Sequence, residues 1–489
     1  MESLFPIPPM NFYIYCSQNF IMKNSVGLLW FLFSFFTLSG QSENPPNFVV
    51  IFCDDLGYGD LGTFGNPIIK TPHLDQLAHE GQKWTQFYVA DPVCTPSRAA
   101  LLTGRYPIRS GMTSSKRVVL FPDSSRGLPH EEITIAEVLK DKGYATAAVG
   151  KWHLGHLPQY LPQAQGFDYY YGIPYSNDMN SSNWGQYRKQ ADDPHYFSKT
   201  EYFDVPLIEN TTEIERPADQ TTITKRYTER AVDFIEKNKE KPFFLYLAHS
   251  LPHIPLFVSD AFKGRSKAGL YTDVIEEIDW SVGKLIEALK KNKLDQNTIV
   301  VFTSDNGPWL LFKTHGGSAG PLRAGKGTTF EGGQRVPTIF WGPGRVKPGT
   351  INDLGSTLDL LSTFAALSGA QTPDDRKMDG YDLSKVLTNK EESPRKEFFY
   401  WAFGELHGYR TSQYKVHIKQ REPVNYGRPT IVLEKPQLYE LRSDISEKYD
   451  VADRFPAVVS EMLERMDDHL KDVEDSRPEQ LSHVIKDFK

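Results

Sequence analysis

The sequence has little cysteine, no strong excess of charge and only one strongly apolar run. Three cysteines in 489 residues exclude a disulfide-rich scaffold. The formal net charge of −7 gives no overall attraction to nucleic acid or to an anionic membrane, so any anionic ligand must be bound by a local group of cations. The remaining composition, with 39% hydrophobic and 24% charged residues, is typical of a globular protein.

The apolar run lies near the N-terminus, from Val26 to Leu38. It follows Lys23 and ends in small residues before a polar segment, which is the pattern of a secretory signal peptide. A membrane span needs about 20 apolar residues, and this run is shorter. We therefore expect the protein to be exported and the leader to be cleaved, with no stable membrane anchor. Met22 directly precedes the lysine, so we expect translation to start there and residues 1–21 to lie outside the protein.

Apolar runs without alternation, typical of strands covered on both faces, recur along the main part of the chain. They are Asn47–Cys53, Ala145–Val149, Phe243–Ala248, Thr298–Thr303 and Thr338–Trp341. An apolar stripe of helical period, from Ile275 to Leu289, lies between two of these runs. Strands that alternate with helices predict an α/β fold with a large mixed, mostly parallel sheet flanked by helices.

Residues just after these strands are the first candidates for a site, because ligands of such sheets bind beyond the carboxyl ends of the strands. They are Asp54, Lys151, His253 and Asp305. Residues 156–220, rich in Tyr, Asn, Pro and Ser with little periodicity, are expected to form surface loops around a pocket.

The pattern changes beyond Leu367, where short strand-like pieces replace the longer apolar runs. These pieces are Phe398–Trp401, Tyr414–Ile418 and Gln437–Leu441, and a helical pattern follows near Ala457–Leu470. We expect a smaller C-terminal domain built on an antiparallel sheet and finished by a helix. The predicted organisation is a leader over residues 1–40, a main domain over 45–380 and a smaller α+β domain over 395–489.

Two pairs of polar residues, Asp54-Asp55 and Asp305-Asn306, come directly after strands. Alone, the first pair is more often a turn or a helix cap, and the second reads as a tight turn because a glycine follows it. Together they would bring three carboxylates and one amide to the same edge of the sheet. Such an all-oxygen set suits Ca²⁺ or Mg²⁺ rather than zinc, which prefers nitrogen or sulfur.

Cys94 opens the run CTPSRAALLTGR, which ends at Arg105. The proline and serine at its start favour a helix beginning, so the cysteine would lie at a helix N-terminus whose free N–H groups attract anions. A lone cysteine in such surroundings is otherwise a buried thiol. The run closely resembles the C-x-P-S-R signature and the L-T-G-R extension of type I sulfatases, and the resemblance extends from about Pro45 to the final strands.

This resemblance implies an alkaline-phosphatase-like fold and a cysteine that a modifying enzyme oxidises to formylglycine. In similar enzymes one hydroxyl of the formylglycine hydrate attacks sulfur, and the other expels sulfate as the aldehyde re-forms. Arg98, one helical turn after Cys94, would offer its charge to the hydrate or to the metal ligands. The implied metal ligands are Asp54, Asp55, Cys94, Asp305 and Asn306, with Ca²⁺ preferred to Mg²⁺.

Further motifs carry the same resemblance. GKWHLG places Lys151 and His153 on one side of an extended segment, where the family's lysine binds sulfate and its histidine orients the hydrate. Without the match, these would be a solvated lysine and a structural histidine. Ser176, in GIPYS, matches a substrate-contacting serine of arylsulfatase A-like members. 

Two more positions complete the implied site. The H-x-P pattern selects His253, with His249 as the alternative, for the acid that protonates the leaving oxygen. Lys326, in GKGTTFEGG, matches the family's lysine that bridges sulfate and nucleophile. A glycine-rich loop alone would be a weak signal.

The resemblance thus implies an exported, arylsulfatase A-like sulfuric ester hydrolase, either periplasmic or secreted, acting on a sulfated small molecule or glycan. Its maturation would need a formylglycine-generating or sulfatase-maturing enzyme, and no nucleic-acid partner is expected. The alternatives are a phosphonate or phosphodiester hydrolase with the same metal site, and an inactive sulfoglycan-binding protein. The segments at 156–220 and 402–436, which should set specificity, contain no motif that names the substrate.

Overall fold

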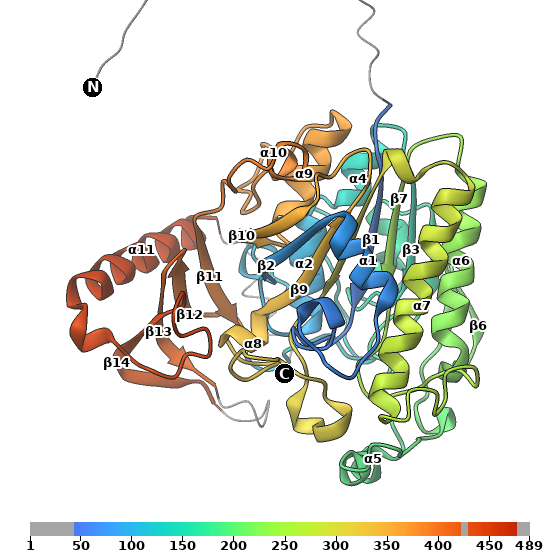
Figure 1. The fold of residues 1–489 in the computed structure, drawn as a ribbon, viewed down its shortest axis with the longest axis horizontal. Helices are drawn as coiled ribbons and strands as arrows, with labels where there is room; N and C mark the ends of the chain where they lie inside the picture. The colour runs from blue at the N-terminus through green and yellow to red at the C-terminus, as the bar shows by residue number, and fades with distance from the viewer. Residues whose placement is uncertain (1–43, 422–428, 477–489) are drawn as a thin grey trace, which may run out of the picture. The chain divides into compact units, whose positions relative to one another are not determined.

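The computed structural model describes residues 44–421 and 429–476, so the predicted leader with Met22, Lys23 and Val26–Leu38 lies outside the described residues. A large sheet forms the centre (Figure 1). It has ten strands in the order β10-β2-β9-β8-β1-β7-β3-β4-β5-β6. Its strands are β1 (Asn47–Cys53), β2 (Gln82–Tyr88), β3 (Ala145–Gly150), β4 (Tyr169–Gly172), β5 (Leu207–Glu209), β6 (Thr212–Glu215), β7 (Phe243–Ala248), β8 (Thr298–Ser304), β9 (Arg335–Trp341) and β10 (Gly349–Ser356). The central strands β8, β1, β7, β3 and β4 run parallel, which confirms the predicted fold class.

Helices cover both faces of this sheet because alternate residues of β1 point to opposite sides. Val49 and Ile51 pack with α1 (Pro72–Glu80), α6 (Ile223–Lys237) and α7 (Leu270–Lys291). Phe48 and Val50 pack with α2 (Cys94–Thr103), α4 (Ile135–Lys140) and α9 (Asp359–Ser368). All seven residues of β1 are buried, as expected of a continuous apolar run.

The remaining helical segments are short. They are α3 (Pro107–Ser110), α5 (Trp184–Gln190), α8 (Glu331–Gln334), α10 (Ser384–Asn389), η1 (Gly62–Phe64), η2 (Pro158–Tyr160), η3 (Pro162–Gln165), η4 (Thr200–Tyr202), η5 (Gln220–Thr222), η6 (Asp295–Asn297), η7 (Leu310–His315) and η8 (Ala452–Arg454). Residues 156–220 are therefore not only loops, since β4, β5, β6 and α5 lie within them. Within 44–421 and 429–476, no helix is both long and apolar enough to cross a membrane.

A second, antiparallel sheet follows in the C-terminal region, in the order β11-β12-β13-β14 (Figure 1). Its strands are β11 (Glu397–Ala402), β12 (Glu405–Thr411), β13 (Tyr414–Gln420) and β14 (Ile431–Glu440), and α11 (Pro456–Asp475) packs on them. Strand β12 was not predicted because its run ELHGYRT has no apolar pattern, although its middle residues are buried. Cross-strand pairing with β11 and β13 forms this strand.

The two sheets are joined by a buried cluster of charges around Glu331 in α8. Its carboxylate accepts hydrogen bonds from Tyr88 of β2 at 2.5 Å and Tyr400 of β11 at 2.6 Å, and pairs with Lys415 of β13 at 2.9 Å. Burial disfavours the charged carboxylate, but Lys415 and two arginines hold the pKa of Glu331 well below its usual range. A charge this deeply buried is tolerated only with such partners, so the cluster fixes α8 between the sheets.

Candidate active site

The carboxyl ends of the central strands bring acidic residues together. Asp54 and Asp55 follow β1, and Asp305 and Asn306 follow its parallel neighbour β8. The backbone N–H of Asp55 donates to Asp305 Oδ1 at 3.1 Å, and Asn306 Nδ2 donates to Asp55 Oδ1 at 2.7 Å. All four predicted oxygen-bearing residues are buried and lie at one edge of the sheet.

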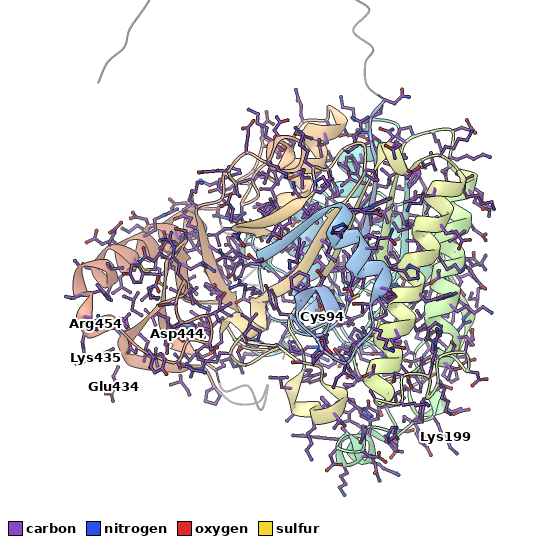
Figure 2. The ribbon with its side chains drawn as sticks, in the orientation of Figure 1. Cys94, Lys199, Glu434, Lys435, Asp444 and Arg454 are labelled. Carbon is purple, nitrogen blue, oxygen red and sulfur yellow. The ribbon has the colours of Figure 1, made fainter. Side chains whose placement is uncertain are left out.

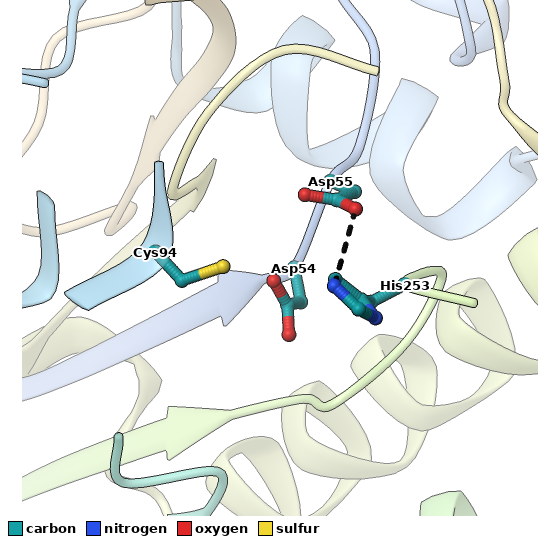
Figure 3. Close-up of side chains that lie close together, drawn as sticks. All are labelled: Asp54, Asp55, Cys94 and His253. Atoms are coloured by element: carbon teal, nitrogen blue, oxygen red, sulfur yellow. Dashed lines mark ion pairs between the residues drawn. The ribbon is translucent and has the colours of Figure 1, made fainter. Parts of the chain in front are cut away.

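Cys94 is the first residue of α2 (Figure 2) and lies beside this group. Only 2% of its surface is exposed. Its Sγ and one ligand atom each from Asp54, Asp55 and His253 all lie within 4.8 Å of one another (Figure 3). Lys326 Nζ is 3.6 Å from Sγ. Burial raises the pKa of the Cys94 thiol above its usual range, so an unmodified thiol here would be a poor nucleophile.

A buried cation stands next to each carboxylate. Arg98 Nη2 lies 2.8 Å from Asp305, Lys326 Nζ lies 2.6 Å from Asp55, and Lys151 Nζ pairs with Asp54. Burial alone would disfavour ionisation of Asp54, but Lys151 and its neighbours hold the pKa of that carboxyl well below its usual range.

The other two carboxyls are not fully compensated by these cations. Burial raises the pKa of Asp55 to about 6, and burial with repulsion from Asp54 raises that of Asp305 to about 7. Asp54 Oδ1 and Asn306 Oδ1 are also buried with no hydrogen-bond partner among the described residues. Buried oxygens without partners are costly, and a hard cation accepts such ligands, so this oxygen set fits Ca²⁺ or Mg²⁺.

His153 presents one ring nitrogen to the cavity. Its Nε2 lies 2.8 Å from the carbonyl oxygen of Leu120 and therefore carries the proton. Its Nδ1 is buried with no partner among residues 44–421 and 429–476, which leaves a free lone pair. Burial and the charge of Lys151 keep the pKa of His153 well below its usual range, so the ring is a neutral acceptor.

His253 and His249 have different surroundings. His253 Nε2 lies 3.5 Å from Ser176 Oγ and 3.6 Å from Asp55. Its Nδ1 lies 3.0 Å from Oδ1 of Asn177, whose amide is itself held by the carbonyl of Pro255 at 3.1 Å. His249 instead lies 3.4 Å from Ser281 on α7. Asn177 was not predicted from the sequence, although it directly follows Ser176.

A cavity of about 330 Å³ opens onto these groups. Its inner wall is formed by Cys94, His153, Ser176, His253 and Lys326. Its outer wall, made of the less buried lining residues, includes Asp178, Trp184, Arg188 and Trp309, none of which was predicted from the sequence. The indole of Trp309 contacts the inner wall, with its ring centre 4.3 Å from Lys326 Nζ and 5.3 Å from the centre of the His253 ring. The volume lies within the roughly 300–1,000 Å³ of small-molecule sites.

Comparison with known proteins assigns the chain to a family. The model described as sulfatase matches residues 46–370, and that of the C-terminal region of aryl-sulfatase matches 393–487. Arylsulfatase A of Homo sapiens is 41% identical over 441 residues, which cover 86% of each chain. N-acetylgalactosamine-6-sulfatase of Mus musculus is 40% identical over 389 residues, covering 78% of this chain and 73% of the relative.

Solved structures agree. The PsFucS1 sulfatase from Pseudoalteromonas sp. superposes with a TM-score of 0.76 at 29% identity, over 89% of this chain and 91% of that one. Ps i-CgsB, solved in complex with k-i-k-neocarrahexaose, superposes with a TM-score of 0.71 at 36% identity, over 87% and 92%. With a buried cysteine, acidic residues and cations at the strand ends, the chain therefore belongs to the sulfatase family and is a sulfuric ester hydrolase.

Proposed function

We propose that the protein hydrolyses sulfate esters of aryl compounds or sugars with a formylglycine hydrate derived from Cys94 and with a bound Ca²⁺. The observation that carries the proposal is the position of Cys94 at the start of α2, within 4.8 Å of Asp54 and Asp55 and 3.6 Å from Lys326. The formylglycine would supply a hydroxyl nucleophile whose partner hydroxyl allows the sulfated intermediate to release sulfate. The Cys94 Sγ marks where that oxygen would lie.

Asp54, Asp55, Asp305 and Asn306 would hold the Ca²⁺, with an oxygen at position 94 as a further ligand. When bound, the ion would supply positive charge beside the nucleophile and the sulfate group. Two features support the assignment: the oxygens of Asp54 and Asn306 that lack partners among the described residues, and the raised pKa values of Asp55 and Asp305.

The cationic and hydroxyl side chains would hold the sulfate group. Lys326 lies beside the nucleophile, and Lys151 donates to Ser176 Oγ at 3.1 Å, so these groups can bind sulfate oxygens together. Arg98 pairs with Asp305 and would keep that carboxylate ionised and in place. His153 Nδ1, with its free lone pair, would accept a proton from the hydroxyl at position 94.

His253 would protonate the leaving oxygen. Its Nδ1–H is shared between the carbonyl oxygen of Ile254 at 2.5 Å and Asn177 Oδ1 at 3.0 Å, which turns Nε2 toward the cavity and Ser176. The imidazolium form is required, and burial with the charge of Lys326 keeps the pKa of His253 well below its usual range. A bound sulfate monoanion next to the ring would favour the protonated form.

Residues 45–380 would then form the catalytic domain and 395–489 a C-terminal domain that holds Lys326 in place through α8. Export to the periplasm or the medium remains our proposal from the leader pattern, as does maturation by a formylglycine-generating or sulfatase-maturing enzyme.

Parallel assays with an aryl sulfate and an aryl phosphodiester, on protein co-expressed with such an enzyme, test the proposal. We expect calcium-dependent hydrolysis of the sulfate ester to exceed that of the phosphodiester. The reverse order would identify a phosphodiester hydrolase, and an absence of both activities after conversion of Cys94 would indicate a sulfoglycan-binding protein.

A further inference from the structure

The helix α5 contributes two side chains to the outer wall of the cavity. Trp184 and Arg188 are four residues apart, which places them on one face of the helix. Both line the same cavity as Cys94, Lys326 and His253. The helix thus brings an aromatic ring and a guanidinium group to the outer wall of this cavity.

Buried contacts hold α5 in place. Tyr187, in the same turn as Arg188, is only 1% exposed. Its hydroxyl lies 2.9 Å from Nδ1 of His315 and accepts a hydrogen bond from the backbone N–H of Leu256 at 3.1 Å. The Trp184 ring packs edge-on against Phe312 at 5.6 Å. The backbone that carries Arg188 is therefore anchored to the body of the protein.

Arg188 differs from the cations around Cys94 in its charge environment. Lys151, Lys326 and Arg98 are buried and each pairs with a carboxylate of the acidic group. Arg188 is exposed, and within the described ranges 44–421 and 429–476 its guanidinium has no ion pair or hydrogen bond. The positive charge of Arg188 is therefore available to a ligand in the cavity.

We propose that Arg188 binds a second anionic group of the substrate, so that the preferred substrates are sugars with a second sulfate or a carboxylate near the scissile ester. This inference rests on the proposed sulfate-ester hydrolysis. A guanidinium group offers a planar pair of donors that matches sulfate or carboxylate oxygens. The cavity has a volume of about 330 Å³, which leaves room for a sugar ring between the inner wall and Arg188.

The net charge of the whole chain also favours such a local cation. With a formal net charge of −7, the protein as a whole repels a polyanionic glycan. Local cations must therefore provide the attraction. Lys151 and Lys326 would be engaged by the scissile sulfate group, so a second anionic group needs a cation of its own. Arg188 adds the charge that distinguishes a dianionic from a monoanionic sugar.

The test compares a panel of monosulfated hexosamines and galactosides with the same sugars carrying a second sulfate. For the wild type we expect kcat/KM to be about fivefold higher for the disulfated member, the size of an exposed ion pair. Arg188→Ala should bring this ratio close to one, mainly through KM, and Arg188→Lys should keep part of it. Lys189→Ala, an exposed neighbour that does not line the cavity, should keep the full ratio.

Dissociation constants of the same sugars, measured by calorimetry on Cys94→Ala protein, give the ratio without turnover. A wild-type ratio near one, or an unchanged ratio in Arg188→Ala, would overturn the role of Arg188. Turnover of aryl sulfates with neither hydrolysis nor binding of any sugar would also overturn it and leave the proposed function intact. If no sulfate ester is hydrolysed, the proposed function fails and the binding ratio still decides the role of Arg188.

Discussion

Lys415 Nζ, on β13 of the C-terminal sheet, lies 2.9 Å from the carboxylate of Glu331, five residues after Lys326, whose Nζ lies 3.6 Å from Cys94 Sγ. The same ammonium group lies 2.9 Å from the carboxylate of Glu447. The side chains of Lys415, Glu331 and Glu447 are all fully buried. The contact gives the smaller sheet a role in the site, because it fixes the segment that carries Lys326 beside Cys94.

Lys415→Met should leave Glu331 as a buried, poorly compensated charge. We expect a loss of about 3–5 kcal/mol in the free energy of unfolding, the usual cost of removing one partner of a buried pair. Urea unfolding measures the loss, and kcat/KM should fall with it because the Lys326 segment loosens. Lys435→Met, on the exposed part of β14 (Figure 2), is the matched control and should change neither quantity. Equal stability of the two variants would contradict the role of the cluster.

Removal of the metal should abolish activity and lower thermal stability. The carboxylates at the strand ends repel one another, so a chelator should lower Tm and added Ca²⁺ should restore it in a concentration-dependent way. Asp54→Asn should remove most of this Ca²⁺-dependent shift and nearly all turnover. Asp260→Asn, at an exposed position, should behave like the wild type in both assays. A calcium-independent Tm in active wild-type enzyme would refute the metal assignment.

The two histidines after β7 should differ in their dependence on the leaving group. His253→Gln should lower kcat by about 10²–10⁴-fold for a sugar sulfate, as expected for loss of a general acid. The loss should be much smaller for nitrophenyl sulfate, whose leaving group departs without a proton. His249→Gln should show no such difference between substrates, because His249 contacts Ser281 and not the cavity. A leaving-group effect in the His249 variant alone would reverse the assignment.

Asp279 on α7 should make stability depend on pH. Burial raises the pKa of this carboxyl to about 7, against partial compensation by the backbone N–H groups of Leu74 at 2.9 Å and His73 at 3.3 Å. At pH values between about 3.9, the pKa of this group in the unfolded chain, and its raised pKa in the folded protein, the folded state binds more protons than the unfolded state. The contribution of Asp279 to stability therefore falls as pH rises, by up to about 1.4 kcal/mol per pH unit.

Asp279→Asn removes this titration and keeps an oxygen acceptor. Urea unfolding at pH 5 and pH 7.5 should therefore show the variant gaining stability relative to the wild type at the higher pH. Asp260→Asn serves again as the exposed control and should follow the wild type. A difference between variant and wild type that is the same at both pH values would contradict the raised pKa.

The sequence predicted the parts of the fold that depend on local pattern. The buried runs such as Asn47–Cys53 became central strands, and the polar residues after them meet at one edge because parallel strands end together. The strand β12 and the helix α5 were missed because contacts distant in sequence stabilise them. Asn177 and Arg188 belong to no motif, and only their neighbours in space, His253 and the cavity, give them a role.

The most direct test of the central claim is the mass of the Cys94 peptide from enzyme co-expressed with a formylglycine-generating enzyme, measured with turnover of an aryl sulfate on the same sample. We predict the mass of an aldehyde in place of the thiol, with activity proportional to the converted fraction and absent in Cys94→Ala. Full sulfatase activity in protein whose Cys94 thiol is intact would contradict the account.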